Sequence, residues 1–225
     1  MTDTPFDWHT NAAIHALQIG VAALYGYGID GDIAEFGCCT GRTAEGLAKG
    51  IVTCDAAFPL RARRELHLFD SFQGFPEADN AIDRRTPDIL DGTWGPGTSR
   101  GIPAPQLAQL VGQYLPPDRV RIIPGWYKDT VRQAPHNLGF YGLIHIDCDF
   151  YGSTMDVLTG LFENSRIAPG ALIYFDDWSC NHANPQFGER RAWSECVQKY
   201  GVHYSDQMAY GIFARCFTIH SYSPS

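Results

Sequence analysis

The sequence lacks a long hydrophobic run, a surplus of positive charge and any Cys-x-x-Cys pair. A spanning helix needs about 20 apolar residues in succession, so no membrane segment is expected. Lysine and arginine together number 17 against 25 aspartates and glutamates, which gives a formal net charge of -8. Such a surface suits neither a nucleic acid nor an anionic membrane, and we expect a small-molecule partner instead.

The seven cysteines show no spacing typical of a zinc module. Cys38 and Cys39 are neighbours, and adjacent residues have poor geometry for a mutual disulfide. The first ten residues lack a basic segment followed by an apolar one, so no secretory signal is visible. These absences predict a cytoplasmic protein with reduced thiols.

What the sequence contains is an alternation of helical and strand patterns that predicts a single domain over residues 1–225. Apolar residues recur at helical spacing over 11–25, inside an N-terminal helical segment, residues 1–30. Strands are expected at 32–37, 65–70, 119–123, 141–147 and 171–175, a hairpin at 202–204 and 210–214, and helices at 43–50, 106–115, 153–164 and 188–199. This order predicts an α/β fold with a mostly parallel sheet. Residues 74–105 show no periodicity, and a loop of that length is typically functional or disordered.

Acidic residues follow several of the predicted strands: Glu35, Asp70, Asp147, Asp149, Asp176 and Asp177. In an open parallel sheet the carboxyl ends of the strands form one edge, where ligands bind. Each acid alone is better explained as a helix cap or a solvated loop residue. Gathered at one edge, however, they indicate a bound cation or hydrogen-bond donors, because clustered carboxylates repel one another.

The first turn carries Gly37 and Gly41, which allow a ligand to approach the backbone closely. It lacks the spacing of a phosphate-binding loop, and this favours a nucleotide cofactor without a pyrophosphate. Asp70 then lies where an acid can accept both hydroxyls of a ribose. Trp126, after the third strand, can either stack on a purine or pack in the core.

Asp147, Asp176 and Asp177 form a set of hard oxygen ligands suited to Mg²⁺. A metal there could bind a substrate hydroxyl, lower its pKa and orient it toward a methyl donor. Asp149 is the candidate general base. His145 is expected to be a satisfied core residue, and His182 a surface loop residue.

Five motifs, in this order, resemble the macrocin O-methyltransferase family: Ala-Glu-Phe-Gly-Cys-Cys-Thr-Gly-Arg, Leu-Phe-Asp-Ser-Phe-Gln-Gly-Phe-Pro, Gly-Trp-Tyr-Lys-Asp-Thr, His-Ile-Asp-Cys-Asp-Phe-Tyr-Gly-Ser-Thr and Phe-Asp-Asp-Trp. The resemblance runs from about residue 32 to 200. That family includes enzymes that methylate antibiotic deoxysugars, such as the noviose enzyme, and its metal site is similar to that of catechol O-methyltransferases.

The resemblance implies a class I S-adenosylmethionine-dependent methyltransferase fold, Rossmann-like, with seven strands of which the last is antiparallel. It implies S-adenosylmethionine contacts from Glu35, Phe36, Gly37, Thr40, Gly41, Asp70, Ser71, Gly125, Trp126 and Asp147. It also implies Mg²⁺ on Asp147, Asp176 and Asp177, with Asp149 as base. The leading helix and the 74–105 lid loop would close over the site or join a homodimer. Cys148 stands where the family usually has glycine, and Trp178 where it often has tyrosine, which leaves the acceptor open.

The expected function is therefore methyl transfer from S-adenosylmethionine to a hydroxyl of a small molecule, a sugar moiety of a natural product or glycoconjugate. The first alternative is a phenolic, catechol-like acceptor, because a sugar diol and a catechol can both chelate one metal. An alternative of another class is a non-catalytic subunit that only binds S-adenosylmethionine. A nicotinamide oxidoreductase is disfavoured because no dinucleotide fingerprint follows a strand.

Overall fold

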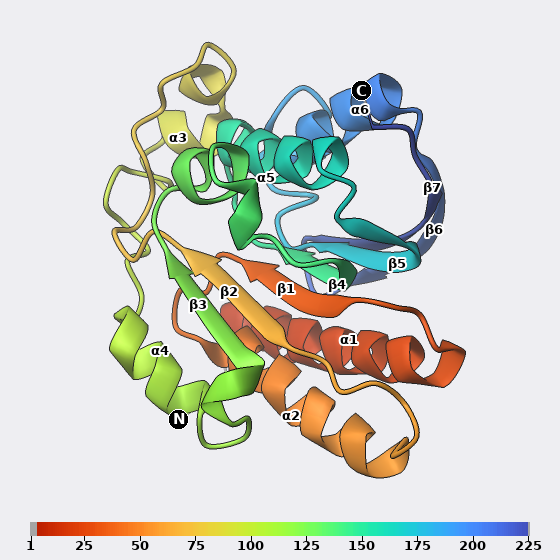
Figure 1. Ribbon diagram of the computed structural model, residues 1–225. Coiled ribbons are helices and arrows are strands. Elements are labelled where there is room, and N and C mark those ends of the chain that lie inside the picture. Colours follow the sequence, from red (N-terminus) through yellow and green to blue (C-terminus); the bar gives the residue numbers. More distant parts are fainter. Residues whose placement is uncertain (1–3, 225) are drawn as a thin grey trace.

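The computed structural model describes residues 4–224 and contains a seven-stranded sheet between two layers of helices (Figure 1). Residues 1–3 and 225, the ends of the predicted domain, lie outside the described residues. The strands are β1 (Asp32–Phe36), β2 (Leu66–Asp70), β3 (Val120–Pro124), β4 (Tyr141–Ile146), β5 (Ile167–Phe175), β6 (His203–Tyr210) and β7 (Ala214–Ser221). Their order is β3-β2-β1-β4-β5-β7-β6, and β7 alone runs antiparallel to its neighbours. This confirms the α/β fold with an antiparallel last strand.

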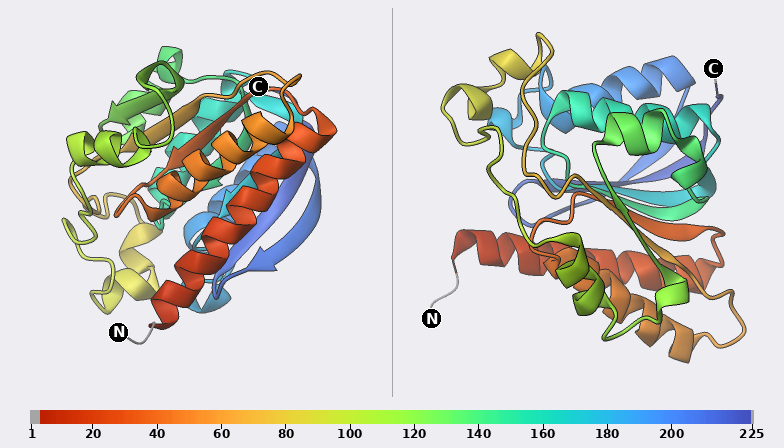
Figure 2. Two further views of the ribbon diagram at one scale, coloured as in Figure 1. Left: turned by 90° about the horizontal axis from the view of Figure 1, so that it is seen from below. Right: turned by 60° about the vertical axis from the view of Figure 1, so that its left-hand side comes forward.

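Helices cover both faces of the sheet (Figure 2). The helices are α1 (Pro5–Tyr27), α2 (Arg42–Ala57), α3 (Pro87–Leu90), α4 (Ala104–Val111), α5 (Tyr151–Glu163) and α6 (Gly188–Tyr200). Short turns of helix are η1 (Asp83–Arg85), η2 (Pro117–Arg119), η3 (Lys128–Arg132), η4 (Pro135–Asn137) and η5 (Asn181–Ala183). One apolar core lies between the sheet and α1, α2 and α4, and the other between the sheet and α5 and α6. Because both faces are covered, β1 and β4 are buried along almost their whole length and show no alternation of buried and exposed residues.

The leading helix α1 is longer than predicted at both ends. Thr4 caps it through a capping box with Asp7, Pro5 occupies the first turn, and Gly28 ends it with a φ of 68°. Its first turns lie at the edge formed by the carboxyl ends of the strands, so they can contribute side chains to a site there (Figure 2). No helix within residues 4–224 combines the length and the apolar character needed to cross a membrane.

The prediction of a strand at 210–214 is wrong, because residues 211–213 form the turn between β6 and β7. Gly211 makes that turn with a φ of 59°. The strand β6 lies at the edge of the sheet and is exposed over most of its length, so it has no alternation of apolar and polar residues to reveal it.

The 74–105 segment is more ordered than its sequence indicates, since it contains η1 and α3 and the start of α4. Asp83 is 2% exposed and accepts hydrogen bonds from the backbone N–H groups of Tyr151 and Gly152, which begin α5 (2.9 and 3.0 Å). Asp88 and Asn181 also bond each other's backbone, at 2.8 and 3.2 Å. The middle of the segment is therefore attached to the body of the protein.

Candidate active site

A cavity of about 340 Å³ lies beyond the carboxyl ends of β1, β2, β3 and β4. Thr10 and Ala13 of α1 form one wall, and Phe75 and Ser99 of the 74–105 segment form another. Nine of the residues predicted for the site line it: Gly37, Thr40, Asp70, Ser71, Gly125, Trp126, Asp147, Asp149 and Asp176. The structure thus brings together residues from separate strand ends, as the topology of a parallel sheet requires.

Glu35, Phe36 and Gly41 were predicted to contact the cofactor, but they are not among the residues that line the cavity. Glu35 is fully buried, and its Oε1 lies 2.9 Å from Nδ1 of His145 on the neighbouring strand. Phe36 stacks on Phe69 with 4.7 Å between ring centroids, and Gly41 is the cap residue of α2. These three residues therefore support the strand end and the start of α2, and Gly37 and Thr40 of the turn after β1 line the cavity.

Gly37 allows the turns after β1 and β4 to touch. It has a φ of 99°, and a Cβ added there would lie 1.9 Å from the carbonyl oxygen of Asp147. The backbone N–H of Asp147 donates to the carbonyl oxygen of Phe36 at 2.9 Å. The glycine of the first turn therefore sets how close Asp147 can come to the cavity.

Asp70 holds the first and second turns together. Its Oδ2 accepts from the backbone N–H groups of Cys38 (2.7 Å) and Cys39 (3.3 Å), and its Oδ1 accepts from that of Phe72 (2.6 Å). A carboxylate has about four acceptor sites, so capacity for a ligand hydroxyl remains. The ribose contact predicted for Asp70 stays a prediction.

Oxygens of Asp147, Asp149 and Asp177 lie within 4.8 Å of one another. Burial raises the pKa of Asp149 and Asp147 well above the usual range, and each is raised further by Asp177. Burial, with Asp176 beside it, raises the pKa of Asp177 to about 7. Asp149 adopts a φ of 58°, a left-handed conformation that a residue with a side chain keeps only where its surroundings impose it. Three hard oxygen donors at this spacing fit a divalent cation.

Asp176, which the sequence placed with Asp147 and Asp177 as a predicted ligand, also contacts two histidines. Its Oδ2 lies 2.8 Å from Nε2 of His9 and its Oδ1 lies 3.8 Å from Nε2 of His145. Although burial opposes ionisation, these two imidazoles lower the pKa of Asp176. The group of carboxylates within 4.8 Å of one another therefore contains Asp149 and not Asp176. Oδ1 of Asp176 nevertheless has no hydrogen-bond partner within residues 4–224, so Asp176 stays a predicted ligand.

Sequence reasoning missed Glu189, which is 1% exposed in the first turn of α6. Its Oε2 accepts from the backbone N–H of Asp177 at 2.9 Å and its Oε1 from that of Cys148 at 3.4 Å. It thus joins the two turns that carry the carboxylates. A glutamate in the first turn of a helix is common, so the sequence alone gives no signal for this contact. His9 was missed as well. His182 is exposed, as expected. His145 is buried, as expected, but it is not fully satisfied, because its Nε2 has no hydrogen-bond partner within residues 4–224.

The 74–105 segment lies over the cavity. Phe75, which lines the cavity, packs on Phe150 with 5.3 Å between ring centroids, and Trp94 packs on the same ring at 5.9 Å. The aromatic cluster attaches this part of the segment to the residue that follows Asp149. Its opening and closing as a lid stay a prediction.

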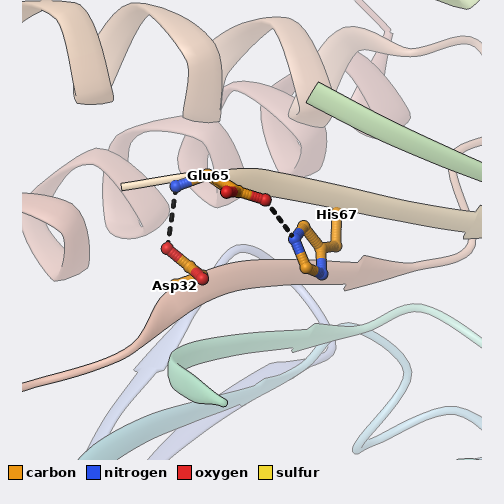
Figure 3. A group of neighbouring side chains, drawn as sticks. All are labelled: Asp32, Glu65 and His67. Carbon is orange, nitrogen blue, oxygen red and sulfur yellow. Dashed lines mark hydrogen bonds and ion pairs between the residues drawn. The ribbon is translucent and has the colours of Figure 1, made fainter. Parts of the chain in front are cut away.

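A second group of titratable side chains, Asp32, Glu65 and His67, lies at the opposite edge of the sheet (Figure 3). Asp32 accepts from the backbone N–H of Glu65 at 2.8 Å, and Nε2 of His67 lies 3.1 Å from a Glu65 oxygen. Nδ1 of His67 lies 2.9 Å from the hydroxyl of Tyr141, which itself accepts from the backbone N–H of Gly139. The polar groups of these side chains are therefore paired with one another, and the group joins β1, β2 and β4 without needing a ligand.

Comparison with known proteins identifies the family. Residues 8–202 match the sequence pattern of the family described as Macrocin-O-methyltransferase (TylF). The chain belongs to the macrocin O-methyltransferase family. A similar relative is Mycinamicin III 3''-O-methyltransferase from Micromonospora griseorubida, 29% identical over 198 residues, or 85% of this chain and 74% of the relative.

A second relative is 8-demethyl-8-(2,3-dimethoxy-alpha-L-rhamnosyl)-tetracenomycin-C 4'-O-methyltransferase from Streptomyces olivaceus. It is 30% identical over 187 residues, which are 79% of this chain and 65% of the relative's length. Among solved structures, the O-methyltransferase NovP superposes with a TM-score of 0.72 at 22% identity, over 92% of this chain and 79% of the other. The likeness confirms the class I S-adenosylmethionine-dependent methyltransferase fold that the sequence predicted.

Proposed function

We propose that this family member transfers the methyl group of S-adenosylmethionine to a hydroxyl of a sugar moiety in a natural product, with help from a divalent cation such as Mg²⁺. The observation that carries the proposal is the meeting of Asp147, Asp149 and Asp177, of which Asp147 and Asp149 line the same cavity as the glycine turn. The names of the relatives support the acceptor, since one of them acts on a rhamnosyl compound.

In this proposal the cavity holds the methyl donor. The backbone of Gly37 and Thr40 lies against it, and Asp70 uses its remaining acceptor sites for the ribose hydroxyls. Trp126 and Gly125, which follow β3, lie where the base of the nucleoside would stack.

The donor set fits a divalent cation because its members are carboxylates, and buried Oδ2 of Asp177 has no hydrogen-bond partner among residues 4–224. Asp147, Asp177 and Oδ1 of Asp176, which also has no hydrogen bond within that range, would hold the ion. When bound, the ion would lower the pKa of a substrate hydroxyl and orient it. Asp149, which lines the cavity and lies beside Asp147 and Asp177, would take the proton from that hydroxyl.

Release of S-adenosylhomocysteine from a panel of glycosylated and phenolic acceptors tests the proposal. We expect turnover of glycosylated acceptors with Mg²⁺, its loss after metal stripping in excess chelator, and recovery on adding metal back. Asp149→Asn should lower kcat by roughly 10²–10⁴-fold, the usual contribution of a general base. Exposed Asp118→Asn, on η2 far from the cavity, is the matched control.

The outcomes separate the alternatives. Full turnover in chelator would refute the metal, and turnover of phenols alone would establish the catechol-like enzyme. Cofactor binding by calorimetry that is indifferent to Mg²⁺, with no turnover of any acceptor, would establish a non-catalytic binding subunit. The proposal also keeps a cytoplasmic location and a homodimer as predictions, and light scattering coupled to size exclusion tests the dimer.

A further inference from the structure

His9 brings the leading helix into the active site. Its side chain is almost fully buried, and its Nε2 lies 2.8 Å from Oδ2 of Asp176 across 167 residues of sequence. Its Nδ1 accepts a hydrogen bond from the backbone N–H of Ile212 at 2.9 Å, in the turn between β6 and β7. Because Nδ1 is an acceptor, the ring proton is on Nε2, and the imidazole donates to Asp176.

The surroundings hold this imidazole in place. Gly211 leaves room for it, since a Cβ added there would lie 2.4 Å from Nδ1 of His9. The first turn of α1 is fixed by its capping box and by Arg42, which lies 2.9 Å from a carboxylate oxygen of Asp7. The helix, the hairpin turn and the end of β5 therefore meet at one side chain.

The hydrogen bond from His9 fixes the orientation of the Asp176 carboxylate. With Oδ2 bonded to His9, the other oxygen is buried and has no hydrogen-bond partner in the part of the chain that the structure describes. Beyond it lies Nε2 of His145, at 3.8 Å, whose own Nδ1 contacts Glu35. A buried carboxylate oxygen without a partner is costly, and a cation would satisfy it.

We propose that His9 is a positioning residue, which orients Asp176 so that Oδ1 is presented to the divalent cation. This inference rests on the proposed function, since it assumes that the carboxylates bind a metal. Partners that orient metal ligands typically contribute 10–100-fold to metal affinity or activity. In this protein such a partner comes from the N-terminal helix, so the docking of α1 and the metal affinity are linked.

Two substitutions separate the two hydrogen bonds of His9. An asparagine side-chain oxygen can occupy the place of Nδ1 and accept from Ile212, whereas a glutamine amide nitrogen can occupy the place of Nε2 and donate to Asp176. The readout is Mn²⁺ binding, measured from the electron paramagnetic resonance signal of the free ion. We expect His9→Asn to weaken binding by about 10–100-fold and His9→Gln to stay within about threefold of the native protein.

A second pair of variants leaves His9 unchanged. Gly211→Ala places a methyl group against Nδ1 and should displace the ring, and we expect it to weaken Mn²⁺ binding by about tenfold or more. Gly201→Ala is its matched control, because Gly201 has a similar φ of 56° and no atom within 4 Å of an added Cβ. It should bind Mn²⁺ as the native protein does. This pair keeps the test decisive if His9→Asn does not fold.

Native Mn²⁺ affinity in both His9→Asn and Gly211→Ala would overturn the inference, and so would an affinity of His9→Gln as low as that of His9→Asn. In the first case His9 would only anchor the hairpin, and in the second the hydrogen bond to Asp176 would not be what sets the metal affinity. In both cases the proposed function would stand. Absence of Mn²⁺ binding to the native protein would instead overturn the metal part of the proposed function, and the role of His9 with it.

Discussion

Gly37→Ala probes the contact that places Asp147 at the cavity. The φ of 99° at this position is one that alanine rarely adopts, and the added methyl group would lie 1.9 Å from a backbone carbonyl oxygen. A carbonyl oxygen cannot move aside as the end of a flexible side chain can. The turns after β1 and β4 must therefore move apart by more than about 1 Å. This is the difference between a normal carbon–oxygen contact distance and the distance from the added Cβ to the carbonyl oxygen.

Two effects contribute to the expected loss of stability. A left-handed backbone costs alanine roughly 1–2 kcal/mol relative to glycine, and overpacking that shifts the backbone costs about 1–3 kcal/mol more. Gly92→Ala is the matched control, because Gly92 has a φ of 85° but no atom within 4 Å of an added Cβ. The control should lose only about 1–2 kcal/mol. A domain with roughly 5–15 kcal/mol of stability survives either change.

Urea unfolding followed by tryptophan fluorescence measures both free energies, and calorimetry with S-adenosylhomocysteine measures the site. We expect the loss of unfolding free energy in Gly37→Ala to exceed that in the control by about 1–3 kcal/mol. Gly37→Ala should also lose cofactor affinity, whereas Gly92→Ala should keep it. Equal destabilisation in the two variants, with equal cofactor affinity, would refute the claim that the two turns are in direct contact.

Three further predictions concern the same site. Glu189→Gln has one acceptor oxygen for two backbone N–H groups and should lose about 1–3 kcal/mol in urea unfolding. Glu195→Gln, on the same helix, keeps one oxygen for the Tyr151 hydroxyl and loses only the charge of its pair with Arg191, so it should lose less than about 1 kcal/mol. Similar losses would contradict the role of Glu189. Because the pKa of Asp177 is raised to about 7, it keeps its proton below that pH, so Mn²⁺ affinity should fall from pH 8 to pH 6 and metal-free stability should fall as pH rises from about 4 to 7. Opposite slopes in titrations and thermal melts would show the sign to be wrong. Trypsin cleavage at exposed Arg100 should slow when cofactor and acceptor are both bound, while cleavage at exposed Arg63 should not change; equal rates with and without ligands would argue against a lid.

The sequence was sufficient to predict the alternation of strands and helices and the edge of the sheet where the acids meet. Buried strands such as β4 are short, mostly apolar segments followed by an acid, and parallel topology then brings those ends together. The glycine turn after β1 was also readable, because only glycine suits the φ of 99° at Gly37. These inferences depend on local patterns and on a general rule of topology.

The orientation of side chains at that edge was not predictable in the same way. Asp176 and Asp177 are neighbours in sequence, yet one bonds to His9 from α1 and the other receives its backbone contact from α6 through Glu189. These partners lie elsewhere in the sequence and reach the aspartates only through the packing of the helices. No local spacing in the sequence encodes them. The same holds for Glu35, whose partner is His145 on the next strand and not the cavity.

The different surroundings of the two adjacent aspartates have a consequence for how the site would accept a cation. His9 and His145 keep the pKa of Asp176 low, whereas burial raises that of Asp177, Asp147 and Asp149. Without a cation the negative charge is therefore concentrated on Asp176, and protons reside among the other three carboxyls at moderately acidic pH. A divalent ion would displace those protons, because the carboxyls are not already ionised when it binds. Its binding should therefore release protons to the buffer. Calorimetry in two buffers of different ionisation enthalpy distinguishes that exchange from simple addition of an ion.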